Sequence, residues 1–358
     1  MFWIFIIIFF SLIGLVILHE FGHFYIAKKF GVEVEEFGIG YPPRLFAKKI
    51  GDVVYSLNLF PFGAFVKVKG EIGGIEDDLS FSNKPIWQRF LIILGGVLSF
   101  WLISFCLFSF VSILGEPVAI GDNDFVKNAK VVVVKVVNNS IAEKYGIKNG
   151  DIILQVKSTK GDIKIEKTSD LQNFIKNNQG EKIELKIKRN NQILTKILDL
   201  PNQKEKAVLG VMITRIAFVK KPFYLAPFEG AKNTVKFTGF VVRSIFNILK
   251  EIIFSHKIPK NVALVGPIGV SIIFYDSLNL GFSYFLWIFA LISIHFAVFN
   301  LLPIPALDGG KLLFLLIESI RKKPINNKLE QNITLFFFFI LLILMIFVTA
   351  NDILKIIH

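Results

Sequence analysis

Residues 18–27 read LHEFGHFYIA and continue an apolar run that begins at Met1. The first 18 residues carry no charged side chain, which is typical of a helix that spans a membrane. Within the same run stand three ionisable residues, His19, Glu20 and His23. An ionisable side chain inside a membrane segment is costly and generally has a function. These ten residues therefore indicate both a membrane fold and a chemical site within it.

Four stretches of the chain are apolar enough to cross a bilayer. They cover residues 2–27, 87–114, 283–317 and 331–350, each near or above the ~20 residues that a spanning helix needs. The chain is 53% hydrophobic over 358 residues and contains 39 phenylalanines, so we interpret it as an integral membrane protein. The net charge of +13 does not indicate a nucleic-acid partner, because no basic stretch is interleaved with aromatic residues. Cys106 is the single cysteine, which excludes an intramolecular disulfide.

Lysine and arginine residues beside the spans predict the orientation of the protein. Basic flanks follow the first span at 28–29, precede the second at 84–89 and separate the third from the fourth at 321–328. Such flanks favour the cytoplasmic side of the membrane. The two termini and residues 116–281 are then expected on the outer side.

Within this outer stretch, residues 122–215 change character. The runs AKVVVVKVV, EKIELKIKR and QILTKILDL alternate as β-strands do. Between the first two runs, SIAEKYGIKNGDIILQVK predicts a short helix, a turn at Lys148–Asp151 and a further strand. The segment resembles a PDZ domain of the circularly permuted bacterial type, and another small α/β module is the alternative.

Residues 226–258 have apolar side chains at helical spacing. Lys232, Lys236, Arg243 and Lys250 interrupt them too often for a comfortable span. We therefore expect an amphipathic helix lying in the outer membrane interface, with a fifth span as the alternative.

His19 and His23 have the spacing of a metal site. Residues at i and i+4 share one face of a helix, so both imidazoles can reach one ion. Glu20 lies between them and could contact a water molecule on that ion. H-E-x-x-H on a helix is the pattern of zinc metalloproteases, in which the glutamate is the general base.

A catalytic zinc ion generally has three protein ligands, so a third is expected elsewhere in the spans. The candidates are His295 and Asp308 in the third span and Glu318 near its end. Asp308 is favoured because it lies deep in an outside-to-inside span, as the two histidines do, whereas His295 is nearer the middle. Around Asp308 the chain reads NLLPIPALDGGKL, in which Pro303 and Pro305 break the helix. A broken helix at membrane depth is tolerated where it lines a cavity.

Together these features resemble the site-2 protease family of intramembrane metalloproteases, and most closely its regulator-of-sigma-E type. The resemblance rests on HEFGH in the first span, the PDZ-like insert and NLLPIPALDGG in the third span, and GPIGV at 266–270 is also similar. It implies Zn²⁺ held by His19, His23 and Asp308, with Glu20 as base. It also implies that Asn300, Pro303 and Pro305 contact substrate. The second span departs from the family, because it reads GGVLSFWL at 95–102 where Gly-Pro-x-x-Asn-Phe is usual.

Residues 37–69 contain two strand-like runs, DVVYSLNLF and GAFVKVKG, directly after the histidines. Similar family segments form a sheet that dips into the membrane near the active site. A peptide bond in a helix is shielded by its own hydrogen bonds, and adding a substrate as a strand to an exposed edge would expose it. An ordinary cytoplasmic hairpin is the alternative.

The expected fold is a polytopic α-helical membrane protein with about four spans, a membrane-associated β-segment and an inserted α/β PDZ-like domain. The expected parts are a first span with HExxH (1–30), a β-segment (31–86), a second span (87–114), a PDZ-like domain (115–225), an interfacial helix and linker (226–281), a third span with the LDG motif (282–319) and a cytoplasmic turn with a fourth span (320–358).

The expected function is zinc-dependent hydrolysis of peptide bonds in transmembrane segments of other proteins, previously trimmed, or in signal-peptide remnants. The expected partners are those membrane substrates and the lipid bilayer of a bacterial inner membrane, and no feature of the sequence specifies an oligomeric state. Two alternatives are a membrane scaffold without catalysis, which leaves the ionisable residues without a purpose, and a metal or proton transporter, which no internal repeat supports.

Overall fold

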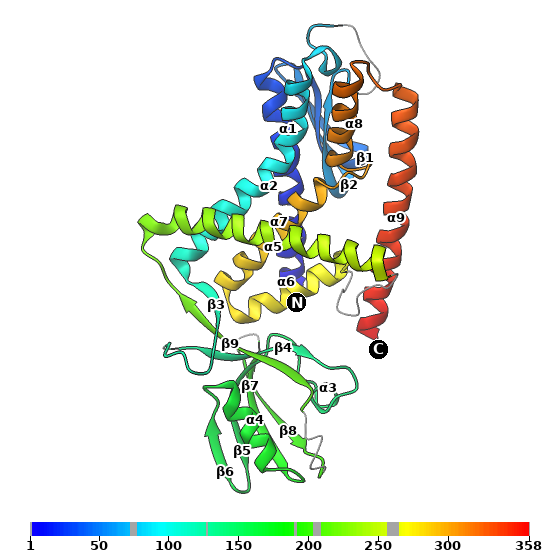
Figure 1. Ribbon diagram of the computed structural model, residues 1–358. Helices are drawn as coiled ribbons and strands as arrows, with labels where there is room; N and C mark the ends of the chain where they lie inside the picture. Colours follow the sequence, from blue (N-terminus) through cyan, green and yellow to red (C-terminus); the bar gives the residue numbers. More distant parts are fainter. Residues whose placement is uncertain are drawn as a thin grey trace. The chain divides into compact units, whose positions relative to one another are not determined.

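The computed structural model describes residues 2–71, 77–126, 128–189, 192–202, 209–255 and 265–357 (Figure 1). The chain divides into two compact units. We call the first the membrane unit; it comprises Met1–Cys106, Ala231–Ser271 and Ala290–His358. The second, the sheet unit, comprises Leu107–Gly230 and Ile272–Phe289.

Four helices among the described residues are long and apolar enough to cross a membrane, which confirms the expected fold class. They are α1 (Phe2–Lys29), α2 (Ile86–Leu114), α7 (Phe282–Asn300) and α9 (Asn327–Ile357). The most apolar part of α2 is 39% buried inside the protein, whereas that of α9 is only 6% buried. The side chains of α9 are therefore suited to contact lipid along most of its length.

Helices α1 and α2 touch through their backbones. A Cβ atom added to Gly22 would lie 2.7 Å from the carbonyl carbon of Gly95, and one added to Gly95 would lie 2.7 Å from the carbonyl oxygen of Gly22. Small residues permit this close approach between helices in a membrane, where dispersion contacts rather than the hydrophobic effect hold helices together. The crossing lies next to the two histidines of α1.

The third apolar stretch is shorter than the expected 283–317, because α7 ends at Asn300 and a second helix, α8 (Asp308–Arg321), begins after an irregular segment. Prolines in this segment lack the N–H groups that would continue a helix. Gly309 and Gly310 then allow the first turn of α8 to pack directly on the backbone of residues 301–305. The start of α8, at Asp308, therefore packs against the irregular segment that precedes it.

Two ion pairs hold α8 to the rest of the membrane unit. Glu318 pairs with Arg89 of α2, and both side chains are more than four-fifths buried. Lys311 pairs with Glu71 at 2.5 Å. Loss of either partner of the buried Arg89–Glu318 pair would leave an unpaired charge inside the protein, which is costly. The two pairs therefore restrict how α8 can be placed.

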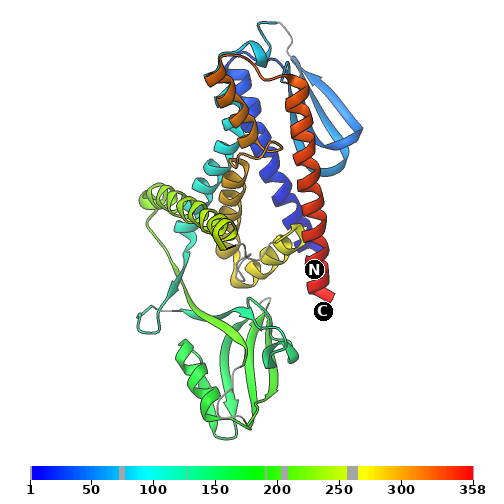
Figure 2. The same cartoon turned by 45° about the vertical axis from the view of Figure 1, so that its right-hand side comes forward.

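Two long strands, β1 (Val34–Ile50) and β2 (Val53–Val68), form the sheet of the membrane unit (Figure 2). Both strands bend, so residues 36–39 pair with 54–57 on one side and with 64–67 on the other. The sequence predicted the two halves of β2 but not β1, whose charged and proline residues hide the alternation. Residues 64–68 have β1 on one side and no strand on the other in the described part of the chain.

The sheet unit contains a seven-stranded sheet in the order β3-β9-β4-β5-β7-β8, with β6 paired to β5. Strands lie where the alternating runs predicted them, and their inward side chains form one apolar core with Leu171 and Phe174 of α4. The elements are β3 (Glu116–Ile120), β4 (Lys130–Val136), α3 (Ile141–Lys144), β5 (Ile152–Ser158), β6 (Gly161–Lys164), α4 (Thr168–Asn177), β7 (Lys182–Arg189), β8 (Gln192–Asp199) and β9 (Val211–Val219).

The remaining elements are two helices, α5 (Ala226–Ser255) and α6 (Pro267–Leu280), and two short 3-10 turns, η1 (Phe81–Asn83) and η2 (Phe223–Leu225). Helix α5 is not among the four apolar enough to span, in keeping with the amphipathic helix expected there. The carboxylate of Asp352 in α9 accepts hydrogen bonds from the backbone N–H groups of Gly266 at 2.8 Å and Gly269 at 2.9 Å. The GPIGV motif therefore forms the N-terminus of α6, and Asp352 of α9 caps this end of the helix.

Asp122 makes a comparable cap in the sheet unit. Its carboxylate accepts from the N–H groups of Thr168 and Ser169 at the start of α4, at 2.9 and 2.8 Å. Burial tends to raise the pKa of Asp122, but these hydrogen bonds outweigh it and lower the pKa to about 2. Because the folded pKa is depressed, the stabilisation is present above the ordinary aspartate pKa and disappears as the pH falls through about 2.

We predict that Asp122→Ala makes the Thr168 and Ser169 amides exchange with solvent about fivefold faster, since loss of a cap costs ~1 kcal/mol. Hydrogen exchange of the intact protein would measure this, with the exposed Glu166→Ala as control. In the unchanged protein the protection should persist down to pH 4. Equal exchange in the two variants would contradict the assignment.

Candidate metal centre

Three side chains from two helices meet at one point in the membrane unit. His19 and His23 come from α1, and Asp308 is the first residue of α8. The Nε2 atoms of the two histidines are 3.3 Å apart, and the Oδ2 atom of Asp308 lies 3.3 Å from one and 3.4 Å from the other. The three side chains are only 10–14% exposed. The depth argument in the sequence thus led to the residue that the structure brings to the histidines.

The chemistry of this triangle fits a bound cation. The Nδ1 atom of His23 lies 2.9 Å from the carbonyl oxygen of Ile92, which can only accept, so Nδ1 carries the proton. In the neutral ring, Nε2 then presents a lone pair toward the Asp308 carboxylate, whose Oδ2 atom is buried without a hydrogen-bond partner among the described residues. Such a contact between acceptors is unfavourable unless a cation lies among them.

The size of the triangle identifies the class of cation. Nitrogen and oxygen ligands lie about 2.0–2.1 Å from zinc, which in a tetrahedron places the ligand atoms about 3.3–3.4 Å apart. The three distances observed here agree with that spacing. Two imidazoles and a carboxylate leave a fourth position open, as in catalytic rather than structural sites.

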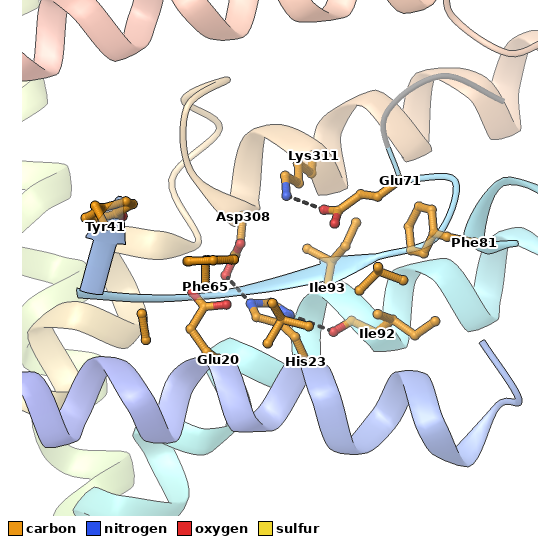
Figure 3. Close-up of a pocket in the computed structure, with 13 residues that line it drawn as sticks. Glu20, His23, Tyr41, Phe65, Glu71, Phe81, Ile92, Ile93, Asp308 and Lys311 are labelled. Carbon is orange, nitrogen blue, oxygen red and sulfur yellow. Dashed lines mark hydrogen bonds and ion pairs between the residues drawn. The ribbon is translucent and has the colours of Figure 1, made fainter. Parts of the chain in front are cut away.

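A cavity of about 230 Å³ opens beside His23 and Asp308 (Figure 3). Glu20 lines it, and its carboxylate points toward Asp308 and His23. Apolar and polar side chains share its walls, which come from six separate parts of the chain. The lining residues are Glu20, His23, Tyr41, Ala64, Phe65, Val66, Val68, Glu71, Phe81, Ile92, Ile93, Asp308 and Lys311.

Helix α2 packs against the two histidines. Besides the Ile92 carbonyl that binds His23, it contributes Gly96, which lies against both rings. A Cβ atom added to Gly96 would lie 2.6 Å from the Cε1 atom of His19 and also 2.6 Å from that of His23. The imidazoles therefore occupy the space that any side chain at position 96 would need.

Sequence reasoning did not identify Lys311 and Glu71, although their ion pair lies in the cavity wall. Lys311 could have been found, because it follows Asp308 by three residues and so shares its helix face. Glu71 gave no such signal, since it reaches Lys311 only through the tertiary fold.

The other predicted residues lie away from this cluster. His295 is exposed on α7, where its Nδ1 atom donates to the Leu291 carbonyl at 2.8 Å, and it does not join the ligand triangle. Asn300 donates to the carbonyl of Phe296 at 3.0 Å within the same helix. Pro303 is exposed and Pro305 is buried in the segment before Asp308, and neither lines the cavity. Their contact with substrate stays a prediction.

Comparison with known proteins gives similarity over nearly the whole chain. The model of peptidase family M50 matches residues 6–344. A Clostridium perfringens protein named as a zinc metalloprotease, CPE1693, is 35% identical over 341 residues, which are 95% of this chain and 96% of that protein. Regulator of sigma-W protease RasP of Bacillus subtilis is 26% identical over 436 aligned residues, with 98% of each chain covered. Zinc metalloprotease RasP of Shouchella clausii is 28% identical over 428, with 96% of each covered.

We predict that Gly96→Ala lowers the metal content of the purified protein at least tenfold, because the new methyl group displaces both imidazoles. Gly14→Ala is the matched control, since it lies in α1 and a Cβ atom there would meet nothing within 4 Å. Elemental analysis at equal protein concentration measures the effect. Full metal occupancy in the Gly96 variant would show that the rings do not need this space.

Proposed function

Because the chain belongs to peptidase family M50, the site-2 proteases, we propose that it is a zinc metalloprotease that cuts transmembrane segments of other proteins. The observation that carries this proposal is the triangle of His19, His23 and Asp308, of which His23 and Asp308 line one cavity with Glu20. The names of the related zinc metalloproteases support zinc as the ion.

His19, His23 and Asp308 would hold the zinc ion. When bound, zinc supplies Lewis acidity, which polarises the scissile carbonyl group and makes the attacking water more acidic. Ile92 fixes the tautomer of His23 so that its Nε2 lone pair is available to the ion.

Glu20 would move the proton in this reaction. Its carboxylate would accept a proton from the attacking water and donate it to the amine of the departing peptide. The apolar side chains in the walls, such as Phe65, Phe81 and Ile92, would limit access of bulk water, which strengthens the interaction of Glu20 with its surroundings. The ion pair of Lys311 and Glu71 lies in the same wall.

The substrate would enter as an extended strand. Residues 64–68 form an edge of the β1–β2 sheet, and four of these five residues line the cavity. Pairing with this edge would hold the substrate backbone outside a helix and beside Glu20. The run Val53–Phe60, the other candidate from the sequence, pairs on both sides and offers no free edge over 54–57.

The physiological setting would be a bacterial inner membrane, with the sheet unit on the outer side and the metal centre toward the cytoplasm. Substrates would be membrane proteins already trimmed by another protease, or signal-peptide remnants. A scaffold or a transporter would also place ionisable groups in the membrane, but neither needs a carboxylate base beside a three-ligand metal site.

We predict that Glu20→Gln retains zinc and reduces cleavage about 100-fold to 10,000-fold, the usual contribution of a general base. His19→Ala, His23→Ala and Asp308→Ala should instead lose zinc, because each removes a ligand atom. Elemental analysis and cleavage of a membrane substrate in detergent measure both properties. His295→Ala is the control and should retain zinc and activity; zinc bound normally by Asp308→Ala would remove Asp308 from the ligand set.

We also predict that proline introduced singly at positions 64–68 reduces cleavage about tenfold wherever the removed N–H faces the free edge, while zinc remains bound. Proline at positions 45–49 serves as control, because that edge of the same sheet does not line the cavity. Unchanged turnover at all five positions would refute strand pairing without affecting the assignment of the metal ligands.

A further inference from the structure

Phe100 of α2 stacks on one of the two histidines. Its ring centroid lies 4.7 Å from that of His19, and the two ring planes differ by only 16°. The Phe100 side chain is 2% exposed, so the stack is enclosed by protein. Phe100 does not line the cavity.

His19 needs such support because it lacks the hydrogen bond that orients His23. The Nδ1 atom of His19 is buried without a hydrogen-bond partner among the described residues, although Gly96 lies beside its ring. His23, by contrast, binds the Ile92 carbonyl. An imidazole that holds a metal ion usually has its second nitrogen fixed by an acceptor.

The backbone of Phe100 is itself fixed. Its carbonyl oxygen accepts hydrogen bonds from the hydroxyl groups of Ser104 at 3.0 Å and Ser293 at 2.8 Å. Both serines are fully buried, and Ser293 belongs to α7. The Phe100 ring also meets Phe296 of α7 edge-on, with centroids 5.7 Å apart. The stacking partner of His19 is thus held by two helices.

We infer that Phe100 is a positioning residue for the metal centre, and that its ring fixes the plane of the His19 imidazole in place of a hydrogen bond. The inference rests on the proposed function, because it requires zinc at His19. A metal-bound imidazole is poor in electrons and the face of a phenyl ring is rich in them, so zinc binding strengthens the stack. The ring therefore acts through its electron density as well as its shape.

The experiment measures the zinc dissociation constant of the full-length protein in detergent by competition with a chelator. Phe100→Leu, which removes the ring, should raise the constant about tenfold, as loss of support around a metal ligand commonly does. Phenylalanines with one, three and five ring fluorines at position 100 keep the shape but withdraw electron density. We expect a stepwise rise to about fivefold in the pentafluoro protein.

Cobalt provides a second measurement. The visible absorption bands of the Co²⁺-loaded protein report ligand geometry, and they should shift in Phe100→Leu. Phe108→Leu is the matched control, since Phe108 lies in the same helix and is 1% exposed, and it should change neither the zinc constant nor the bands.

A fluorinated series with a constant zinc affinity would overturn the inference, and so would a folded Phe100→Leu protein that binds zinc normally. Should Phe100→Leu fail to fold, the fluorinated proteins, which preserve packing, still decide the matter. Failure of the unchanged protein to bind zinc would refute the proposed function itself.

Discussion

The backbone contact between α1 and α2 at Gly22 and Gly95 is the constraint on which the metal centre depends. It brings the helices close enough for the Ile92 carbonyl to reach His23 and for the rings to pass over Gly96. A larger residue at the crossing would separate the helices by the width of a side chain. The hydrogen bond between His23 and Ile92 and the packing of Gly96 against both imidazoles would then be lost together. Three glycines thus determine the geometry of side chains that they do not themselves provide.

Charge imposes the second constraint, on α8. This helix brings Asp308 to the histidines, yet it is joined to α7 only by a segment without regular structure. The pair of Arg89 and Glu318 near one end and the pair of Glu71 and Lys311 near the other limit its rotation and sliding. The largely buried pair of Arg89 and Glu318 adds little net stability, but the loss of one partner would be strongly destabilising, so this pair specifies position.

Local sequence patterns were sufficient to predict the parts of the molecule that have a simple helical or strand periodicity. The four apolar helices and most strands of the sheet unit follow from run length and alternation, and His19, Glu20 and His23 follow from the i, i+4 spacing. Asp308 required an argument about depth in the membrane. Strand β1 could not be read from the sequence, because Arg44, Lys48 and Lys49 interrupt its alternation and pairing on both sides of residues 36–39 is a tertiary property. The contact of Phe100 with His19 and the pairing of Glu71 with Lys311 likewise depend on how distant segments meet, which no local period encodes.

The proposed ligands of the metal centre also lie far apart in the order of synthesis. The two histidines are made with the first helix, but Asp308 follows the entire seven-stranded sheet and α7. A chain emerging from the ribosome therefore holds the histidines and the glutamate for most of its translation without a complete ligand set. Since domains generally fold in the order in which they are made, the protease would lack its full set of proposed ligands while its own early helices enter the membrane.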